Sequence, residues 1–492
     1  MPKRALPTER PPIELDPHLP EPLYRQLYGR LRGAILAGRL PRGARLPSTR
    51  ALAGELGISR TTAALAYEQL QMEGYLESRI GSGTVVSRHL PATPRVVQTA
   101  AAGDSPSARL AARVSPLRTI PNLSGVEGRA GGAFRAGEPA LDLFPFGLWA
   151  QLIARRARRS LAQTSYYQEP AGYAPLRTAI AAHIAVSRGV RCAPEQIILT
   201  AGAQGALDLA GRALLDPGEA AWIEDPGYFG ARGALVSAGA RLVPVPVDEH
   251  GLDVADGRRR APDARLAFCS PSHQYPTGTT MNLGRRLALL DWAEQAGAWI
   301  LEDDYDSEFR FGGRPLEALQ GLDRTGRVLY VGTFSKALFP ALRLGFLVAP
   351  ADLIEPLLTT RRFADVHLPL LEQLALADFM AEGHFVRHLQ RMREHYRERR
   401  NLLRQELEAR LGGLLDVRAP EAGMQMVGWL PPGIDDGRAA ALAAEAGILV
   451  TPVSRFSLEP LPRGGLIFGY ASTDEQGIRI GVEKLAAALD RL

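Results

Sequence analysis

The stretch Tyr330-Val331-Gly332-Thr333-Phe334-Ser335-Lys336 (YVGTFSK) decides how the larger part of this 492-residue chain is interpreted. Its apolar start predicts a buried strand, which ends in small and hydroxyl-bearing residues and then a lysine. Lysine is rare here: only three of the 58 basic residues are lysines, and only Lys336 lies far from both ends. Because lysine, unlike arginine, can lose its proton and form an imine with an aldehyde, Lys336 is the candidate catalytic residue. Arg343, seven positions further on, is a candidate phosphate ligand.

Two upstream segments supply groups that suit the cofactor pyridoxal phosphate (PLP). The run Trp299–Leu301 leads to Asp303, and a carboxylate beside a pyridine nitrogen keeps the ring protonated and electron-withdrawing. The run Gln196–Leu199 leads to Thr200–Gly205 (TAGAQG), where a helix is expected to begin, and free N–H groups at a helix start bind phosphate. A glycine-rich turn is by itself more often plain structure. Together with Lys336, the segments indicate a PLP site.

Apolar runs alternate with helix-length amphipathic stretches from about residue 131 to residue 492. The runs are Gln196–Leu199, Ala221–Ile223, Leu266–Phe268, Trp299–Leu301 and Val328–Val331. This alternation predicts an α/β domain with a mostly parallel sheet and helices on both faces. We expect a large part at about 170–350 and a smaller C-terminal part at about 351–492.

The segment 17–87 has the pattern of a second, small domain, a winged helix-turn-helix. An apolar residue recurs every fourth position at Leu23, Leu27, Leu31 and Ile35. Two further helices are expected after Ser48 or Thr49 and after Ser59, because these residues are good N-caps. Two short strands around residues 81–83 then form a hairpin. Residues 88–130 are rich in Ala, Ser, Gly and Pro without periodicity, which predicts a flexible linker.

The net charge of +5 is concentrated in the small domain, where nine Arg face five Glu between Glu21 and Ser87. An arginine excess alone is equally typical of an ordinary solvated surface. The order of the elements favours DNA, because the second helix of such a motif enters the major groove while flanking groups contact phosphates. The candidate DNA-binding residues are Arg45, Arg50, Ser59, Arg60, Thr61, Thr62 and Arg79.

The small domain resembles the GntR superfamily of bacterial transcription factors. The resemblance lies in Leu46–Arg50 (LPSTR), Leu56–Thr62 (LGISRTT), Glu73–Leu76 (EGYL) and Gly81–Thr84 (GSGT). It implies DNA contacts from Arg50, Ser59, Arg60, Thr61, Thr62 and Gly81 of the wing. Ala64 stands where some members carry an arginine that contacts DNA.

The segment from about Phe134 to Leu492 resembles the fold-type I PLP aminotransferases, and the whole chain is similar to the MocR/GabR family of PLP-dependent regulators. The resemblance lies in Ser272–Gly278 (SHQYPTG), Glu302–Arg310 (EDDYDSEFR) and Gly332–Lys336 (GTFSK). It implies that Lys336 holds PLP through an imine, Asp303 faces the ring nitrogen, Tyr305 bonds the ring hydroxyl and Tyr228 stacks on the ring. It places the phosphate on Ala203, Gln204, Thr333, Ser335 and Arg343. Tyr167 would reach the phosphate in the partner subunit of a homodimer.

Two positions depart from the aminotransferase pattern. Tyr275 stands where many members have an asparagine, and either His273 or Gln274 takes over its role. Ile467 stands where many members have the arginine that binds the carboxylate of an amino acid, which should weaken ordinary amino-acid binding. Arg463 or Arg479 remains a candidate substitute. The signal is therefore expected to be PLP itself or an effector other than a simple α-amino acid.

The resemblance implies a bacterial transcription regulator whose aminotransferase-like domain senses PLP, or an amine or amino acid that reacts with it, and alters operator binding. Net turnover is not expected, although an active aminotransferase with a DNA-binding appendage is the alternative. A domain-swapped dimer and a contact with RNA polymerase remain open expectations. The absence of a signal peptide or a membrane-spanning apolar run, with Cys192 and Cys269 as the only cysteines, predicts a cytoplasmic protein. No metal site is predicted.

Overall fold

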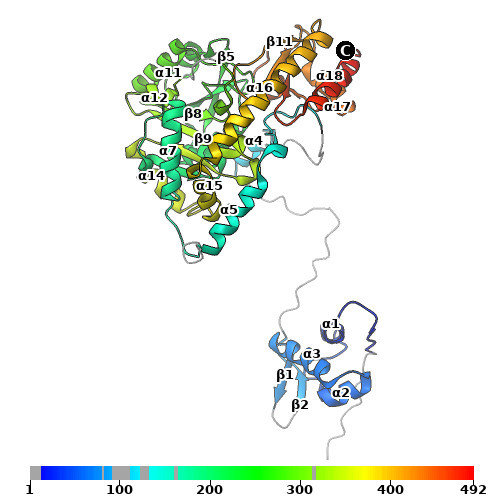
Figure 1. The fold of residues 1–492 in the computed structure, drawn as a ribbon. Helices are drawn as coiled ribbons and strands as arrows, with labels where there is room; N and C mark the ends of the chain where they lie inside the picture. The colour runs from blue at the N-terminus through cyan, green and yellow to red at the C-terminus, as the bar shows by residue number, and fades with distance from the viewer. Residues whose placement is uncertain (1–12, 80–82, 91–110, 122–131, 160–164, 313–316) are drawn as a thin grey trace, which may run out of the picture. The chain divides into compact units, whose positions relative to one another are not determined.

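The structure, a computed structural model, describes residues 13–79, 83–90, 111–121, 132–159, 165–312 and 317–492. The chain divides into two compact units, Met1–Arg109 and Leu110–Leu492, which are described separately (Figure 1). Among the described residues, no helix combines the length and the hydropathy that a membrane crossing needs.

The small unit is a winged helix-turn-helix, as predicted. Its elements are α1 (Leu23–Leu36), α2 (Thr49–Leu56), α3 (Arg60–Met72), β1 (Leu76–Arg79) and β2 (Gly83–Val86), with β1 and β2 antiparallel. Leu27, Leu31 and Ile35 of α1 pack with Ala63 and Leu70 of α3 in one apolar core. The predicted caps are present, because the Ser48 hydroxyl accepts a hydrogen bond from Ala51 N (3.2 Å) at the start of α2.

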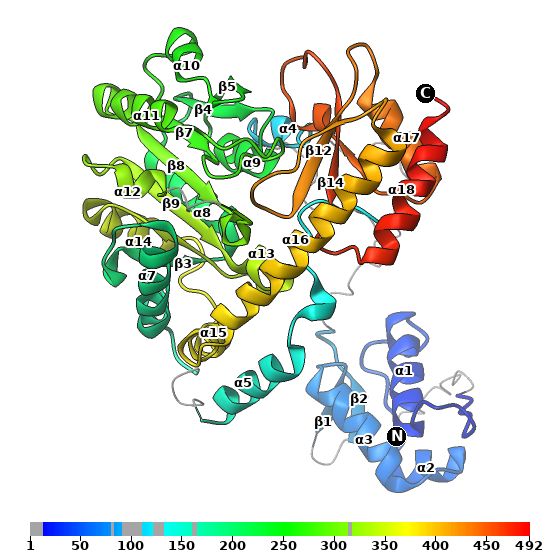
Figure 2. The same ribbon diagram turned by 45° about the horizontal axis from the view of Figure 1, so that its top comes forward.

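An eight-stranded sheet forms the centre of the large unit, in the order β3-β10-β9-β8-β7-β4-β5-β6 (Figure 2). The five predicted strands are present: β3 (Ile197–Thr200), β4 (Ala220–Asp225), β7 (Leu266–Cys269), β8 (Trp299–Asp304) and β9 (Val328–Thr333). Strands β5, β4, β7, β8 and β9 are mutually parallel. The sequence pattern missed β10 (Gly345–Val348), which runs antiparallel between β3 and β9. It also missed β5 (Arg241–Asp248) and the edge strand β6 (Gly251–Leu252).

Helices cover both faces of this sheet, as predicted. One apolar layer includes side chains from α8 (Gly202–Leu214), α9 (Phe229–Ser237) and α14 (Ile354–Arg362). A second layer includes side chains from α10 (Val254–Arg260) and α11 (Leu283–Ala296), and here Trp222 of β4 stacks on Trp292 at 3.7 Å between ring centroids. Because both faces are covered, the central strands begin with runs of apolar residues, and charged residues follow only at the carboxyl ends of β4 and β8.

The C-terminal part has its own antiparallel sheet, in the order β11-β12-β14-β13. These strands are β11 (Asp416–Val417), β12 (Gln425–Trp429), β13 (Thr451–Pro452) and β14 (Gly465–Gly469). The 28-residue helix α16 (His384–Leu411) packs beside α18 (Glu475–Leu489), and α17 (Asp436–Glu445) packs on α18 (Figure 2). The largest apolar core of the chain joins these helices to the strand ends of the eight-stranded sheet.

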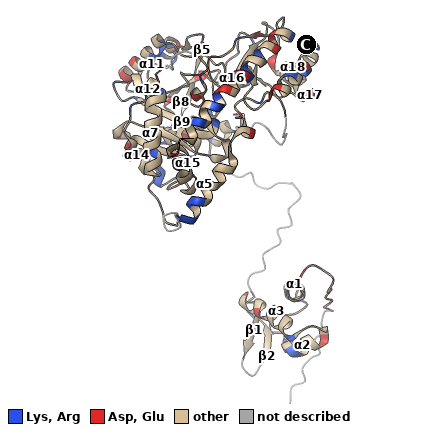
Figure 3. Ribbon diagram, in the orientation of Figure 1, with Lys and Arg blue, Asp and Glu red and all other residues tan. Residues whose placement is uncertain are grey.

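The remaining helices surround these two sheets. They are α4 (Val114–Leu117), α5 (Phe146–Arg159), α7 (Ala174–Arg188), α12 (Leu319–Leu322), α13 (Phe334–Ala337) and α15 (Leu371–Ala381). Figure 3 shows basic residues gathered at the end of α5, where Arg155 donates to Asp378 of α15 at 2.8 Å. The expected linker 88–130 is not extended throughout, because α4 lies within it and contacts α9; much of the rest of the linker lies outside the described residues.

Candidate functional site

The candidate site lies where five strands of the eight-stranded sheet end. Because β3, β4, β7, β8 and β9 point the same way, their carboxyl ends lie along one edge. Lys336 follows β9, Asp303 is the penultimate residue of β8, Tyr228 follows β4, and α8 begins shortly after β3. This edge is where open α/β sheets bind ligands. Residues that are more than one hundred positions apart in the sequence are thereby brought together.

The Lys336 amine is held inside the site. Lys336 lies on the one-turn helix α13, and its Nζ donates a hydrogen bond to Gly137 O at 2.6 Å. Burial lowers the pKa of Lys336, against the opposing charges of Asp306, Glu138 and Asp303. The neutral amine, which is the nucleophilic form, is therefore more populated than it would be in water.

Asp303 presents a buried carboxylate with an unused oxygen. Its side chain is 4% exposed, and Oδ1 has no hydrogen-bond partner among the described residues. Burial and the neighbouring charges of Asp304 and Asp306 raise its pKa to about 7. An unpaired buried carboxylate is costly unless a donor arrives, and a protonated pyridine nitrogen is such a donor. The residues present at this position therefore fit PLP.

Three tyrosine rings lie next to one another over this edge. The ring of Tyr275 is 6.1 Å from that of Tyr228 and 5.9 Å from that of Tyr305, both in edge-on contact. The Tyr228 ring packs tightly on Gly230, where a Cβ would lie 2.3 Å from Tyr228 Cζ. Burial raises the pKa of all three phenols, so they are neutral hydroxyls at physiological pH.

His273 and Gln274 occupy different places. The Gln274 amide donates to Pro226 O (2.8 Å) and to Tyr275 O (2.6 Å), while its oxygen accepts from Thr277 N (3.1 Å). It is thus occupied in holding its own loop. His273 Nδ1 lies 3.0 Å from the Tyr305 hydroxyl and 3.0 Å from the Asp306 carboxylate, and its Nε2 is buried without a partner in the described chain. Of the two, His273 is the one that contacts Tyr305.

The start of α8 and Arg343 form a cradle for an anion. Gly202 has a positive φ of 74°, and a Cβ there would lie 3.5 Å from a nitrogen of the Arg343 guanidinium. Arg343 Nη2 donates to Ala201 O at 2.8 Å. Ala203 and Gln204 lie in the first turn of this 13-residue helix, where backbone N–H groups have no helical partner.

Thr333 and Ser335 border this cradle on the α13 side. The Thr333 hydroxyl accepts a hydrogen bond from Ser335 N at 3.2 Å and so caps α13. Tyr167 is 87% exposed, and its ring lies 5.9 Å from that of His367. The role of Tyr167 in a partner subunit therefore stays a prediction.

A buried ion pair behind the site was not visible in the sequence. Arg188 donates to Asp304 Oδ2 at 2.6 Å and to Ser272 Oγ at 2.6 Å, and the Tyr330 hydroxyl donates to Asp304 Oδ2 at 2.8 Å. Burial alone would raise the pKa of Asp304, but the charge of Arg188 holds it below its ordinary value. Asp304 therefore stays charged and anchors the end of β8 beside Asp303. The doubled Asp303-Asp304 was a signal, but its partner is 116 residues away.

The candidate DNA-binding residues lie around the start of α3. The Ser59 hydroxyl accepts from Thr62 N at 3.0 Å and lies 2.8 Å from the Thr62 hydroxyl, so these two residues cap the helix. Arg60 and Thr61 on the same turn are exposed, as are Arg45 and Arg50. Arg79 ends β1, and Gly81 lies outside the described residues.

The structure also places Ile467, which stands at the position of the missing arginine, and the two candidate substitutes Arg463 and Arg479. Ile467 of β14 is completely buried in an apolar cluster with Val427, Val453 and Phe456. Arg463 donates to Asp416 at 3.3 Å and lies over the Trp429 ring. Arg479 on α18 donates to Glu406 at 2.6 Å. In the described ranges, no group of three or more His, Cys, Asp or Glu residues is placed to hold a metal ion.

Comparisons with known proteins assign both units. Residues 136–485 match the aminotransferase class I and II family, and residues 23–86 match the bacterial regulatory proteins of the gntR family. The fold and the site together define a DNA-binding domain joined to a domain of the PLP-dependent aminotransferase family, which confirms the predicted fold class and cofactor. The chain belongs to the MocR/GabR-type transcriptional regulators.

Two named regulators match this chain over nearly its whole length, and a solved aminotransferase matches about three quarters of it. The chain is 42% identical to the probable rhizopine catabolism regulatory protein MocR of Rhizobium meliloti, over 97% of this chain and 95% of that protein. It is 32% identical to the pyridoxine biosynthesis transcriptional regulator PdxR of Corynebacterium glutamicum, over 97% and 98%. The solved structure of LysN from Thermus thermophilus, an alpha-aminoadipate aminotransferase complexed with N-(5'-phosphopyridoxyl)-L-leucine, matches with a TM-score of 0.67 at 32% identity, covering 77% of this chain and 95% of that chain.

Proposed function

We propose that this regulator holds PLP at Lys336 and that the ligand state of this site alters its binding to operator DNA. One observation carries the proposal: the Lys336 amine and the Asp303 carboxylate, whose Oδ1 has no partner among the described residues, lie at the same edge of the sheet. The same chain also has a DNA-binding domain. When bound, PLP supplies an aldehyde that condenses with primary amines and a ring that withdraws electrons.

The protein side chains have separate tasks in this proposal. The lowered pKa of Lys336 provides a neutral amine. The raised pKa of Asp303 shows that its charged form is poorly stabilised, so a positively charged partner would stabilise it. Tyr305, placed by His273, is positioned to donate to the ring hydroxyl, and Tyr228 covers one ring face. Arg343 and the first turn of α8 neutralise the phosphate. In this proposal residues 17–87 bind DNA, residues 88–130 are the linker and residues 131–492 form the PLP-binding effector domain.

The PLP site controls DNA binding by shifting the equilibrium between two conformations of the protein. A ligand favours the arrangement to which it binds more tightly, so a homodimer with two sensor sites would present its DNA-binding domains differently in each state. Tyr167 then contributes to the partner's phosphate site, and the protein acts in the cytoplasm. A domain-swapped dimer and a contact with RNA polymerase are compatible extensions.

An active aminotransferase is the second candidate, and the intact set of Lys336, Asp303 and Tyr305 favours it. The absence of an arginine at Ile467 favours the regulator without net turnover, because a carboxylate substrate loses its bidentate partner. Sustained conversion of an amino donor and a keto acid by the purified protein would support the enzyme instead.

One titration tests the proposal. The purified full-length protein is mixed with PLP and then with candidate amines, while visible absorbance and binding to a DNA fragment selected from a random pool are measured on the same samples. We expect PLP to produce a visible chromophore that borohydride fixes to Lys336, and amines to change the chromophore and the DNA affinity together. A protein that stays colourless with PLP, or a DNA affinity that neither PLP nor the amines change, would overturn the proposal.

A further inference from the structure

The face of the four-stranded sheet that points away from the largest core carries a buried amide without a partner. Along β12 the side chains alternate, so Met426 enters the largest core while Gln425 and Val427 lie on the opposite face. Gln425 is 1% exposed, and within the described ranges neither its Nε2 nor its Oε1 makes a hydrogen bond. Buried amides of this kind are uncommon and call for a missing partner.

Gln425 lies in the wall of a cleft between the two parts of the large unit. The cleft has a volume of about 990 Å³. Pro226 and Thr277 line it from the strand-end loops of the eight-stranded sheet, and Trp429 and Arg463 line it from the C-terminal part. This is the size range of small-molecule sites, and the lining of the cleft combines polar and apolar side chains.

The amide is close to the position where related enzymes bind a carboxylate. Val427 pairs directly with Ile467 across β12 and β14, and Gln425 is two residues from Val427 on the same face. Gln425 and Ile467 are therefore diagonal neighbours, which long side chains can bridge. This wall thus offers an uncharged amide at position 425 and an aliphatic side chain at 467.

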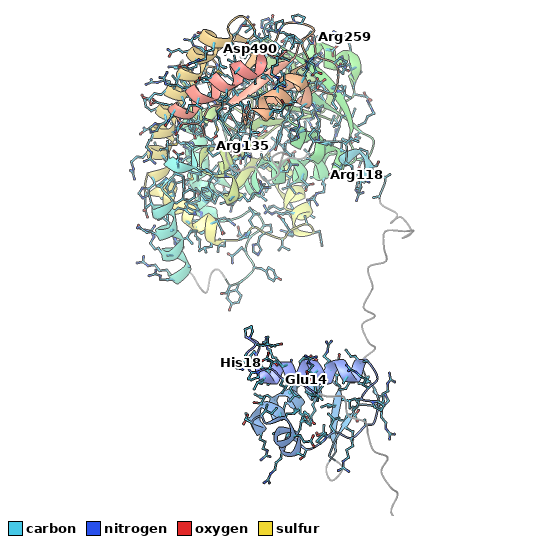
Figure 4. The ribbon with its side chains drawn as sticks, turned by 90° about the vertical axis from the view of Figure 1, so that its right-hand side faces the viewer. Glu14, His18, Arg118, Arg135, Arg259 and Asp490 are labelled. Atoms are coloured by element: carbon cyan, nitrogen blue, oxygen red, sulfur yellow. The ribbon has the colours of Figure 1, made fainter. Side chains whose placement is uncertain are left out.

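The segment Phe134–Gly137 connects this wall to Lys336. Gly469, the register partner of Gln425, donates to Phe134 O at 2.9 Å, while Gly137 O accepts from Lys336 Nζ at 2.6 Å. Ala136, between these points, packs with the apolar cluster that contains Val427 and Ile467. Figure 4 labels Arg135 of this segment within the large unit.

We propose that Gln425 is an effector-specificity residue, which recognises an uncharged hydroxyl group on an amine whose amino end is taken at the Lys336 site. The inference rests on the proposed function of that site. A hydroxyl both donates and accepts, so it satisfies the amide oxygen and nitrogen together, whereas a carboxylate accepts only and faces the Oε1 oxygen unfavourably. Arg463 does not replace the missing carboxylate partner, because it is engaged with Asp416 and Trp429.

The test uses the full-length protein loaded with PLP and three amines of equal chain length: propylamine, 3-amino-1-propanol and β-alanine. The concentration that half-converts the visible absorbance is measured for each amine, with the shift in melting temperature as a second readout. We expect 3-amino-1-propanol to act at a roughly fivefold lower concentration than propylamine or β-alanine, as one good hydrogen bond provides.

Gln425→Met should bring 3-amino-1-propanol to within about twofold of propylamine and leave propylamine unchanged, since only the hydrogen bond is removed. Gln295→Met, the same change at an exposed position on α11, should keep the preference. Gln425→Glu should instead favour 1,3-diaminopropane, and it tests the position even if the methionine variant fails to fold.

The outcomes separate this inference from the proposed function. Failure of PLP to produce a chromophore in the unmodified protein overturns both. A normal chromophore with β-alanine preferred, or with the hydroxyl preference unchanged in Gln425→Met, overturns the role of Gln425 alone. A glutamate variant that shows no preference for the diamine does the same.

Discussion

The two sheets of the large unit differ in how much of the aminotransferase pattern they keep. At the strand ends of the eight-stranded sheet lie Lys336, Asp303 and Tyr305, the residues that we propose hold PLP. On the face of the four-stranded sheet that points away from the largest core, Ile467 stands where many aminotransferases have the carboxylate-binding arginine, and a buried amide lies nearby at Gln425. If the proposed roles are right, the difference means that the residues that hold the cofactor and the residues that select its ligand can change independently.

The largest expected effect comes from removing the Lys336 amine at the edge of the eight-stranded sheet. Lys336→Ala should abolish the visible chromophore completely, because Lys484, the only other lysine among the described residues, is exposed on α18. Borohydride reduction followed by mass spectrometry measures the retained cofactor. Lys484→Ala, at an exposed position on α18, is the matched control and should stay coloured. Absorbance that survives Lys336→Ala would place the covalent link elsewhere.

The next effect concerns His388, which connects α16 of the C-terminal part to the carbonyl of Ala337 beside Lys336, at 3.0 Å. Burial lowers the pKa of His388 to about 4, so its neutral form stabilises the fold above pH 6.5 and that stability is lost as the pH falls through 4. Between pH 6.5 and 5 the loss should be about 2 kcal/mol.

His388→Gln keeps a donor for Ala337 O and removes the titration. The melting temperature of the variant should therefore fall less than that of the unmodified protein over this pH range. If the melting temperatures of the variant and the unmodified protein fall equally, His388 takes up its proton equally in the folded and the unfolded protein. The contact between α16 and Ala337 would then not depend on the neutral form of His388.

Restoring a charge on the second sheet sharpens the comparison. Ile467→Arg should lower the half-saturating concentration of L-alanine by about tenfold, because a guanidinium binds a carboxylate in bidentate fashion. The readout is the visible absorbance of the PLP-loaded protein. Ile467→Met, of similar volume and without charge, should give no gain. An arginine variant that is correctly folded but no better than the methionine variant would mean that the ligand carboxylate does not face this wall.

The smallest expected effect is on DNA binding by the small unit. Arg60→Ala should weaken DNA binding several-fold and reduce the slope of log affinity against log salt by about 1, as the loss of one phosphate contact does. Arg30→Ala, exposed on α1, should leave the slope unchanged. If both variants behave alike, Arg60 is not a phosphate contact.

Local sequence patterns predicted most of the fold, but they did not predict contacts between residues that are far apart in the sequence. The five central strands and the caps at Ser48 and Ser59 follow from short stretches whose burial or hydrogen bonding is decided by neighbours in the sequence. Strand β10 was missed because its antiparallel place depends on β3, about 150 residues earlier. The Arg188–Asp304 pair and the unpaired state of Gln425 depend on the packing of separate elements, which no single stretch of sequence records.

All five tryptophans, at 149, 222, 292, 299 and 429, belong to the large unit, and Trp222 and Trp292 are stacked in its core. Fluorescence excited selectively at tryptophan therefore follows the unfolding of the large unit only, while far-ultraviolet circular dichroism follows both units. Any gap between the two denaturation curves would measure, without an added label, how independently the DNA-reading module melts.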